Sequence, residues 1–175
     1  MKSNIALIGF MGTGKTAVGQ LLARKLGKKF VEMDSLIEQK AGKAIPDIFK
    51  QDGEIAFREL EIEVTKEVSK EKDSVIACGG GIVLNKINID RLKEGAIIVY
   101  LKAAPGAILK RTAKQAGQRP LLNVDNPTQA IGDLLRFRKP FYERAADIPI
   151  NTSKLSLEAV VEQIIAKLRE HESFR

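Results

Sequence analysis

Residues 9–16 read Gly-Phe-Met-Gly-Thr-Gly-Lys-Thr and fill every fixed position of the phosphate-binding pattern G-x-x-x-x-G-K-[ST]. Glycines let the backbone turn tightly enough for successive N–H groups to point at one anion. Residues 4–8 have the apolar composition of a strand, and residues 17–26 have helical periodicity that ends at Gly27. A strand, a loop and a helix in this order place phosphates at a helix N-terminus, where the macrodipole favours anions. The sequence therefore predicts a nucleotide-binding loop rather than a turn with an incidental lysine.

Length, cysteine content and charge narrow the class of protein. The 175 residues suit a single domain over 1–175, and one cysteine, Cys78, excludes an internal disulfide. No stretch resembles a signal peptide or approaches the roughly 18 apolar residues of a membrane span, so we expect a cytoplasmic protein without a membrane partner. The net charge is +7, but basic residues form no run of five and aromatic residues are only 5% of the chain. We expect small anionic substrates and no nucleic acid.

Strand and helix patterns alternate from end to end. Alternation predicts a three-layer α/β/α sandwich around a five-stranded parallel sheet. The long helix after Gly53 should bury Ile55, Leu60, Ile62, Val64 and Val68. A polar segment, about residues 112–126, joins two helices and is expected to form a mobile lid. After the first unit, strands are expected at 29–33, 74–78, 96–101 and 147–150, and helices at 34–40, 45–50, 105–114, 127–146 and 156–170.

Two carboxylates end the second predicted strand. Glu32 and Asp34 stand at i and i+2, so on a strand both would point to the face of the phosphate loop. Carboxyl ends of strands are where ligands bind in open α/β sheets. Asp34 could instead serve only as the cap of the next helix.

Glycines and arginines supply further candidates. Gly79-Gly80-Gly81 directly follows a strand, which indicates close approach of a ligand to the main chain, although a tight turn is the alternative. Arg58 and Arg138, taken alone, are typical of surface arginines, and Arg58 could pair with Glu54 or Glu61. Cys78, at a strand end, is expected to be a small buried apolar residue rather than a nucleophile.

Five further motifs follow the phosphate loop in a specific order. They are Phe30 to Glu38 (Phe-Val-Glu-Met-Asp-Ser-Leu-Ile-Glu); Ile48-Phe49 with Gly53-Glu54 and Phe57-Arg58-Glu59; Gly79-Gly80-Gly81; Arg119-Pro120-Leu121-Leu122; and Arg138-Lys139-Pro140-Phe141-Tyr142. Through these motifs the chain resembles the shikimate kinase family over nearly its full length. Many families share the phosphate loop, so the other five motifs make the resemblance specific.

The resemblance implies a monomeric P-loop kinase that passes the γ-phosphoryl of ATP to the 3-hydroxyl of shikimate, with Mg²⁺ as cofactor. By this resemblance Lys15, Asp34 and Arg119 are catalytic: Asp34 orients or deprotonates the hydroxyl, and Arg119 closes with the lid onto the phosphates. A helical region of about residues 34–62 would help to bind shikimate. The implied ATP contacts are Gly12, Thr13, Gly14, Lys15, Thr16, Ala17, Arg111, Arg119 and Lys154; the implied shikimate contacts are Asp34, Arg58, Gly79, Gly80, Gly81 and Arg138; and the implied metal ligands are Thr16 and Glu32.

Two departures from the family pattern leave alternatives open. The family usually has Asp-x-Asp where this chain has Glu32-Met33-Asp34, so the first carboxylate keeps its charge on a longer side chain. Near the adenine turn, Lys154 stands where arginine is common, and Arg111 is the stronger candidate to stack on adenine. The alternatives are a kinase of a related polyol acid such as gluconate, and an ATP-binding regulatory module that has lost catalysis.

Overall fold

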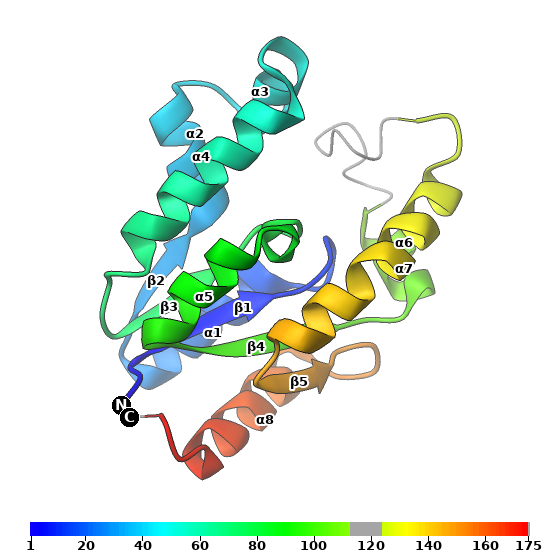
Figure 1. The fold of residues 1–175 in the computed structure, drawn as a ribbon. Helices are drawn as coiled ribbons and strands as arrows, with labels where there is room; N and C mark the ends of the chain where they lie inside the picture. Colours follow the sequence, from blue (N-terminus) through cyan, green and yellow to red (C-terminus); the bar gives the residue numbers. More distant parts are fainter. Residues whose placement is uncertain (113–123, 175) are drawn as a thin grey trace.

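One parallel sheet organises the chain. A computed structural model describes residues 1–112 and 124–174, and its five strands lie in the order β2-β3-β1-β4-β5 (Figure 1). All four neighbouring pairs are parallel, as the alternation of strands and helices predicts. The strands are β1 Asn4–Ile8, β2 Lys29–Glu32, β3 Ser74–Ala77, β4 Ala96–Lys102 and β5 Ile148–Asn151.

Helices cover both faces of this sheet. Alternate residues of a strand point to opposite faces, so Ile5 and Leu7 pack in one apolar cluster with the first and last helices of the chain, whereas Ala6 and Ile8 pack in another with helices on the opposite face. The three-layer α/β/α sandwich is therefore confirmed (Figure 1). The helices are α1 Lys15–Leu26, α2 Met33–Ala41, α3 Ile45–Gln51, α4 Gly53–Val68, α5 Lys86–Gly95, α6 Pro105–Thr112, α7 Pro127–Ala145 and α8 Leu157–Glu170, with a 3-10 turn η1 at Ile82–Leu84.

Three local expectations need correction. Helix α5 is not predicted by the sequence pattern, because its buried side combines Ile89 and Leu92 with the polar Asn88, while Ile87 is exposed. In α4, Val64 and Val68 are buried as expected, but Ile55 is 78% exposed. Phe57 and Glu61 of α4 are buried instead. The second strand ends at Glu32, so Asp34 lies in the first turn of α2 and not on a strand.

The strand order brings distant loops together. Strands β3 and β2 lie on one side of β1, and β4 and β5 lie on the other. The loops at such a switch point form the ligand crevice of α/β sheets. The phosphate loop after β1 and the glycine turn after β3 consequently lie at the same edge of the sheet. No helix among residues 1–112 and 124–174 is both long and apolar enough to cross a membrane.

Candidate active site

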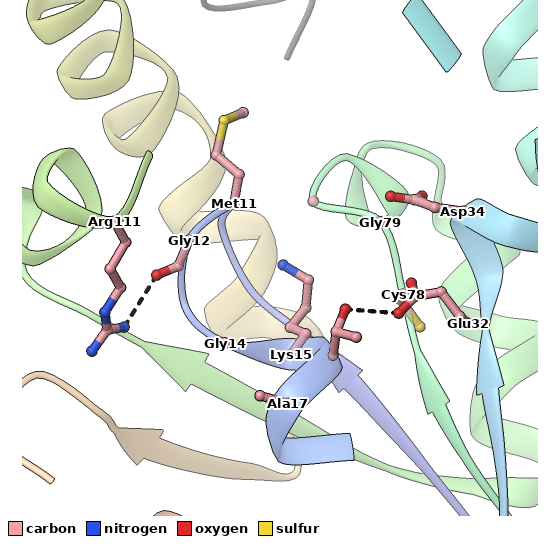
Figure 2. Close-up of a pocket in the computed structure, with 12 residues that line it drawn as sticks. Met11, Gly12, Gly14, Lys15, Ala17, Glu32, Asp34, Cys78, Gly79 and Arg111 are labelled. Carbon is pink, nitrogen blue, oxygen red and sulfur yellow. Dashed lines mark hydrogen bonds between the residues drawn. The ribbon is translucent and has the colours of Figure 1, made fainter. Parts of the chain in front are cut away.

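A cavity of about 340 Å³ opens at the carboxyl ends of β1, β2 and β3. Figure 2 shows the phosphate loop and Arg111 on one side of it, with Glu32 and Asp34 on the other. The lining residues are Met11, Gly12, Gly14, Lys15, Thr16, Ala17, Glu32, Asp34, Cys78, Gly79, Gly80 and Arg111. The structure therefore brings most of the predicted ATP, metal and acceptor residues to one place.

The phosphate loop has the backbone that its glycines predict. Gly12 and Gly14 have φ of 75° and 88°, in the region that residues with a Cβ rarely adopt. Gly14 immediately precedes α1, so the phosphate loop lies at the N-terminus of this helix. The Lys15 ammonium folds back over the loop and donates to the carbonyls of Gly9 and Phe10 at 2.8 and 2.9 Å. A positive charge is thereby held above amides that suit an anion.

Thr13 and Arg111 brace this loop from two sides. Thr13 is buried, and its hydroxyl donates to the Phe10 carbonyl at 2.7 Å, so its side chain shapes the loop rather than lining the cavity. Arg111, from α6, donates to the Gly12 carbonyl at 3.1 Å (Figure 2). Lys154 is exposed in the turn after β5 and does not line this cavity.

A hydroxyl and a carboxylate meet beside Lys15. The Thr16 hydroxyl donates to Glu32 Oε2 at 2.7 Å (Figure 2). Burial raises the pKa of Glu32, and the Thr16 hydrogen bond and the Lys15 charge act against this rise. Glu32 and Asp34 face the same cavity as predicted, although a strand end and a helix start position them, not one strand. Glu32 stands at the N-cap position of α2, and Asp34 lies in the first turn of that helix.

Arg58 is held by a buried carboxylate. Its Nη1 lies 3.1 Å from Glu61 Oε1, and the side chains of Arg58 and Glu61 are 13% and 1% exposed. Glu54 lies farther off, at 3.6 Å from Arg58 Nε. Burial raises the pKa of Glu61, while the charge of Arg58 lowers it. The sequence leaves Glu54 and Glu61 as alternative partners of Arg58. Glu61 is the closer of the two, because α4 turns its side chain into the protein.

The turn at Gly79–Gly81 has no room for larger side chains, because charged groups of the protein lie beside its backbone. A Cβ on Gly81 would lie 2.3 Å from Arg58 Nη1, and a Cβ on Gly80 would lie 3.5 Å from Arg138 Nη1. On Gly79 it would approach Glu61 Oε2 and Asp34 Oδ1, at 3.1 and 3.3 Å. The expected close approach to this backbone is therefore made by the protein's own charged groups.

Arg138 is not a surface arginine. It is 3% exposed, its guanidinium carbon lies 5.8 Å from the centre of the Phe10 ring, and its Nε has no hydrogen-bond partner. Two guanidinium groups, from α4 and α7, thus converge on one turn. Tyr142 on α7 also reaches this turn, which the sequence pattern does not predict, because aromatic residues on a helix are usually core.

Two more expectations concern Cys78 and Arg119. Cys78 is 2% exposed and burial raises the pKa of its thiol, so it remains a thiol, as expected of a buried apolar residue. Arg119 lies outside the described residues, as does most of the expected lid at 112–126. Among the described residues no cluster of three or more His, Cys, Asp and Glu side chains could hold a metal.

Comparisons with known proteins agree with this geometry. The family model described as shikimate kinase matches residues 11–169. A curated shikimate kinase of Thermodesulfovibrio yellowstonii is 49% identical over 162 residues, which are 93% of this chain and 92% of that protein. The solved structure of shikimate kinase from Acinetobacter baumannii in complex with shikimate has a TM-score of 0.94 and 38% identity, with 99% of this chain and 96% of that chain covered.

A gluconokinase from Sinorhizobium meliloti is more distant. Its structure has a TM-score of 0.60 at 15% identity over 97% of this chain and 94% of that chain, which shows a shared fold and nothing about the acceptor. The family model, in contrast, matches residues 11–169, and the Thermodesulfovibrio yellowstonii relative covers 93% of the chain at 49% identity. This protein belongs to the shikimate kinase family.

Proposed function

We propose that the chain transfers the γ-phosphoryl group of ATP to the 3-hydroxyl of shikimate, giving shikimate 3-phosphate and ADP. The convergence of Arg58 and Arg138 on the Gly79–Gly81 turn, beside Asp34 and the phosphate loop, carries this proposal. Two guanidinium forks suit a carboxylate, because each can donate two parallel hydrogen bonds. An acceptor that joins a carboxylate to a ring of hydroxyls matches this set of groups.

Each group has a stated task in the transfer. Arg58, Arg138 and the backbone of the glycine turn hold the acceptor, and Asp34 orients its hydroxyl. That hydroxyl oxygen forms a bond to the γ-phosphorus while the bond from this phosphorus to the β–γ bridging oxygen breaks, and Asp34 accepts the hydroxyl proton. Lys15 and the amides of the phosphate loop stabilise the charge that moves onto the leaving ADP.

The nucleotide and the metal complete the proposal. Gly12, Gly14, Thr16 and Ala17 line the cavity together with Arg111, and Arg111 is proposed to stack on adenine. Thr16 and Glu32 fit Mg²⁺, because a hydroxyl and a carboxylate oxygen already lie within hydrogen-bond distance of each other. Mg²⁺ would neutralise charge on the β- and γ-phosphates. Arg119 and Lys154 as ATP contacts and the monomeric state are proposed from the family resemblance, whereas the single domain, the lid and the cytoplasmic location are proposed from the sequence pattern and composition.

A coupled assay of ADP release tests the proposal. With ATP and Mg²⁺, we expect release that depends on shikimate and is absent with gluconate. The Lys15→Met variant is the control for a contaminating kinase. Turnover of gluconate without shikimate would favour the polyol-acid alternative, and ATP binding without turnover of either acid would favour the regulatory alternative.

A further inference from the structure

Tyr142 occupies a central place behind the acceptor side of the cavity. It lies on α7, one helical turn beyond Arg138, and its side chain is fully buried. The Tyr142 hydroxyl donates a hydrogen bond to the carbonyl oxygen of Gly80. The Arg138 side chain lies beside the same phenol, where its charge and hydrogen bonding oppose the rise that burial causes in the pKa of Tyr142. One phenol oxygen therefore adjoins both the glycine turn and the guanidinium.

The ring of Tyr142 is fixed from the opposite side. It stacks on Tyr100 of β4, with ring centroids 5.1 Å apart and planes inclined by 21°. Tyr100 pairs in the sheet with Ile8, the last residue before the phosphate loop. A ring held between a helix and a central strand leaves its hydroxyl little freedom to move. The Gly80 carbonyl is therefore held at a fixed position relative to the sheet.

The hydrogen bond of this hydroxyl falls on the glycine turn, which belongs to the acceptor side. Gly80 and Arg138 approach each other closely, since a Cβ on Gly80 would lie 3.5 Å from Arg138 Nη1. Fixing the Gly80 carbonyl also orients the N–H of the same peptide, which belongs to Gly81. Lys15, in contrast, is bonded to the carbonyls of Gly9 and Phe10, which the hydroxyl does not touch. Loss of the hydroxyl should thus disturb one substrate and spare the other.

We propose that Tyr142 is a positioning residue that sets the Gly80–Gly81 peptide and the Arg138 guanidinium at a fixed separation, so that both meet the acceptor carboxylate together. This inference rests on the proposed function. It adds a residue that acts through two others and does not itself line the cavity. Its side chain sets affinity for the acceptor without contacting it.

The test compares Tyr142→Phe with Tyr100→Phe. Each variant keeps its ring and loses one hydroxyl, and of the two hydroxyls only that of Tyr142 bonds the Gly80 carbonyl beside Arg138. We expect Tyr142→Phe to raise the KM for shikimate about 3- to 10-fold, as for loss of one hydrogen bond, with the KM for ATP within about twofold. Tyr100→Phe should leave both constants unchanged. The Gly81 amide signal in NMR spectra should shift in Tyr142→Phe alone, and urea unfolding verifies that both variants fold.

Each other outcome overturns the inference. An unchanged KM for shikimate shows that the hydroxyl does not position the acceptor groups. Equal increases in both KM values indicate a general structural role. If the unmodified protein does not phosphorylate shikimate, the proposed function fails, and the Gly81 signal alone then decides: a signal that does not move in Tyr142→Phe removes the link between Tyr142 and the turn.

Discussion

Replacing Arg58 by methionine should separate two tasks of this side chain, which are binding the acceptor and compensating a buried carboxylate. Methionine matches the unbranched stem of arginine as far as Nε and removes the charged end of the guanidinium. Arg58 is 13% exposed and lies 3.1 Å from Glu61, which is 1% exposed. Water therefore does not readily replace the lost partner, and the substitution costs the full free energy of an unpaired buried charge.

The binding effect follows from the loss of one charge-assisted partner of the acceptor carboxylate. Such a hydrogen bond contributes about 1.5–3 kcal/mol, which corresponds to a KM for shikimate raised about 10- to 150-fold. The KM for ATP should stay the same, because Arg58 is not among the residues that line the nucleotide side of the cavity.

The stability effect depends on pH through Glu61. Removal of one partner of a buried ion pair costs about 3 kcal/mol, or roughly 6–12 °C in Tm for a chain of this length. Burial raises the pKa of Glu61 above its ordinary value, and the charge of Arg58 limits that rise. A group whose pKa is higher in the folded state favours folding when protonated, and this contribution is lost as the pH rises through the folded pKa. Without Arg58 that pKa rises further, so the destabilisation should be larger at about pH 8 than at about pH 5.

Steady-state kinetics and urea unfolding at both pH values measure these effects. The control is Arg136→Met, on the surface of α7, where the side chain is 79% exposed and pairs with Asp133, so little change is expected. The double variant Arg58→Met/Glu61→Gln should recover most of the stability and keep the raised KM for shikimate. A normal KM in the double variant, or a KM raised for ATP instead, would refute the arrangement of the site.

Three further predictions concern Lys15, Glu32 and the glycine turn. Lys15→Met should lower kcat about 100-fold or more with unchanged unfolding in urea, because the charge above the phosphate loop is lost; normal turnover would contradict its role. Glu32→Asp should retain turnover, whereas Glu32→Gln should raise the Mg²⁺ concentration for half-maximal rate. Because burial raises the pKa of Glu32, the unmodified protein should also need more Mg²⁺ as the pH falls through that pKa, and a flat Mg²⁺ requirement from about pH 5 to 8 would count against this site. Gly81→Ala should raise the KM for shikimate by displacing Arg58, since the new Cβ would lie 2.3 Å from its Nη1. The matched control is Gly132→Ala in α7, where nothing lies within 4 Å, and urea unfolding should show it to be about 0.5–1 kcal/mol more stable.

Local patterns predicted the parts of the fold that local chemistry controls. The phosphate loop was predictable because its glycines require backbone angles that few other residues adopt, and the left-handed Gly27 and Gly42 end α1 and α2 for the same reason. The sheet was predictable because strands that are apolar on both faces, such as β4, need helices on both sides. Helix α5 was missed, since its buried side includes Asn88 and its apolar period is weak.

The sequence by itself determined a nucleotide-binding α/β protein, because the motif around Lys15 and the alternation of elements depend on neighbours along the chain. Only the tertiary structure decided which face each charged residue presents. Arg58 and Arg138 have the local sequence of surface arginines, yet both lie against the Gly79–Gly81 turn from helices far apart in the chain. Glu61 is likewise buried, and the Tyr142 hydroxyl bonds the Gly80 carbonyl beside Arg138. The physical reason is that these contacts depend on the order of strands and the packing of helices, which no short stretch of sequence encodes.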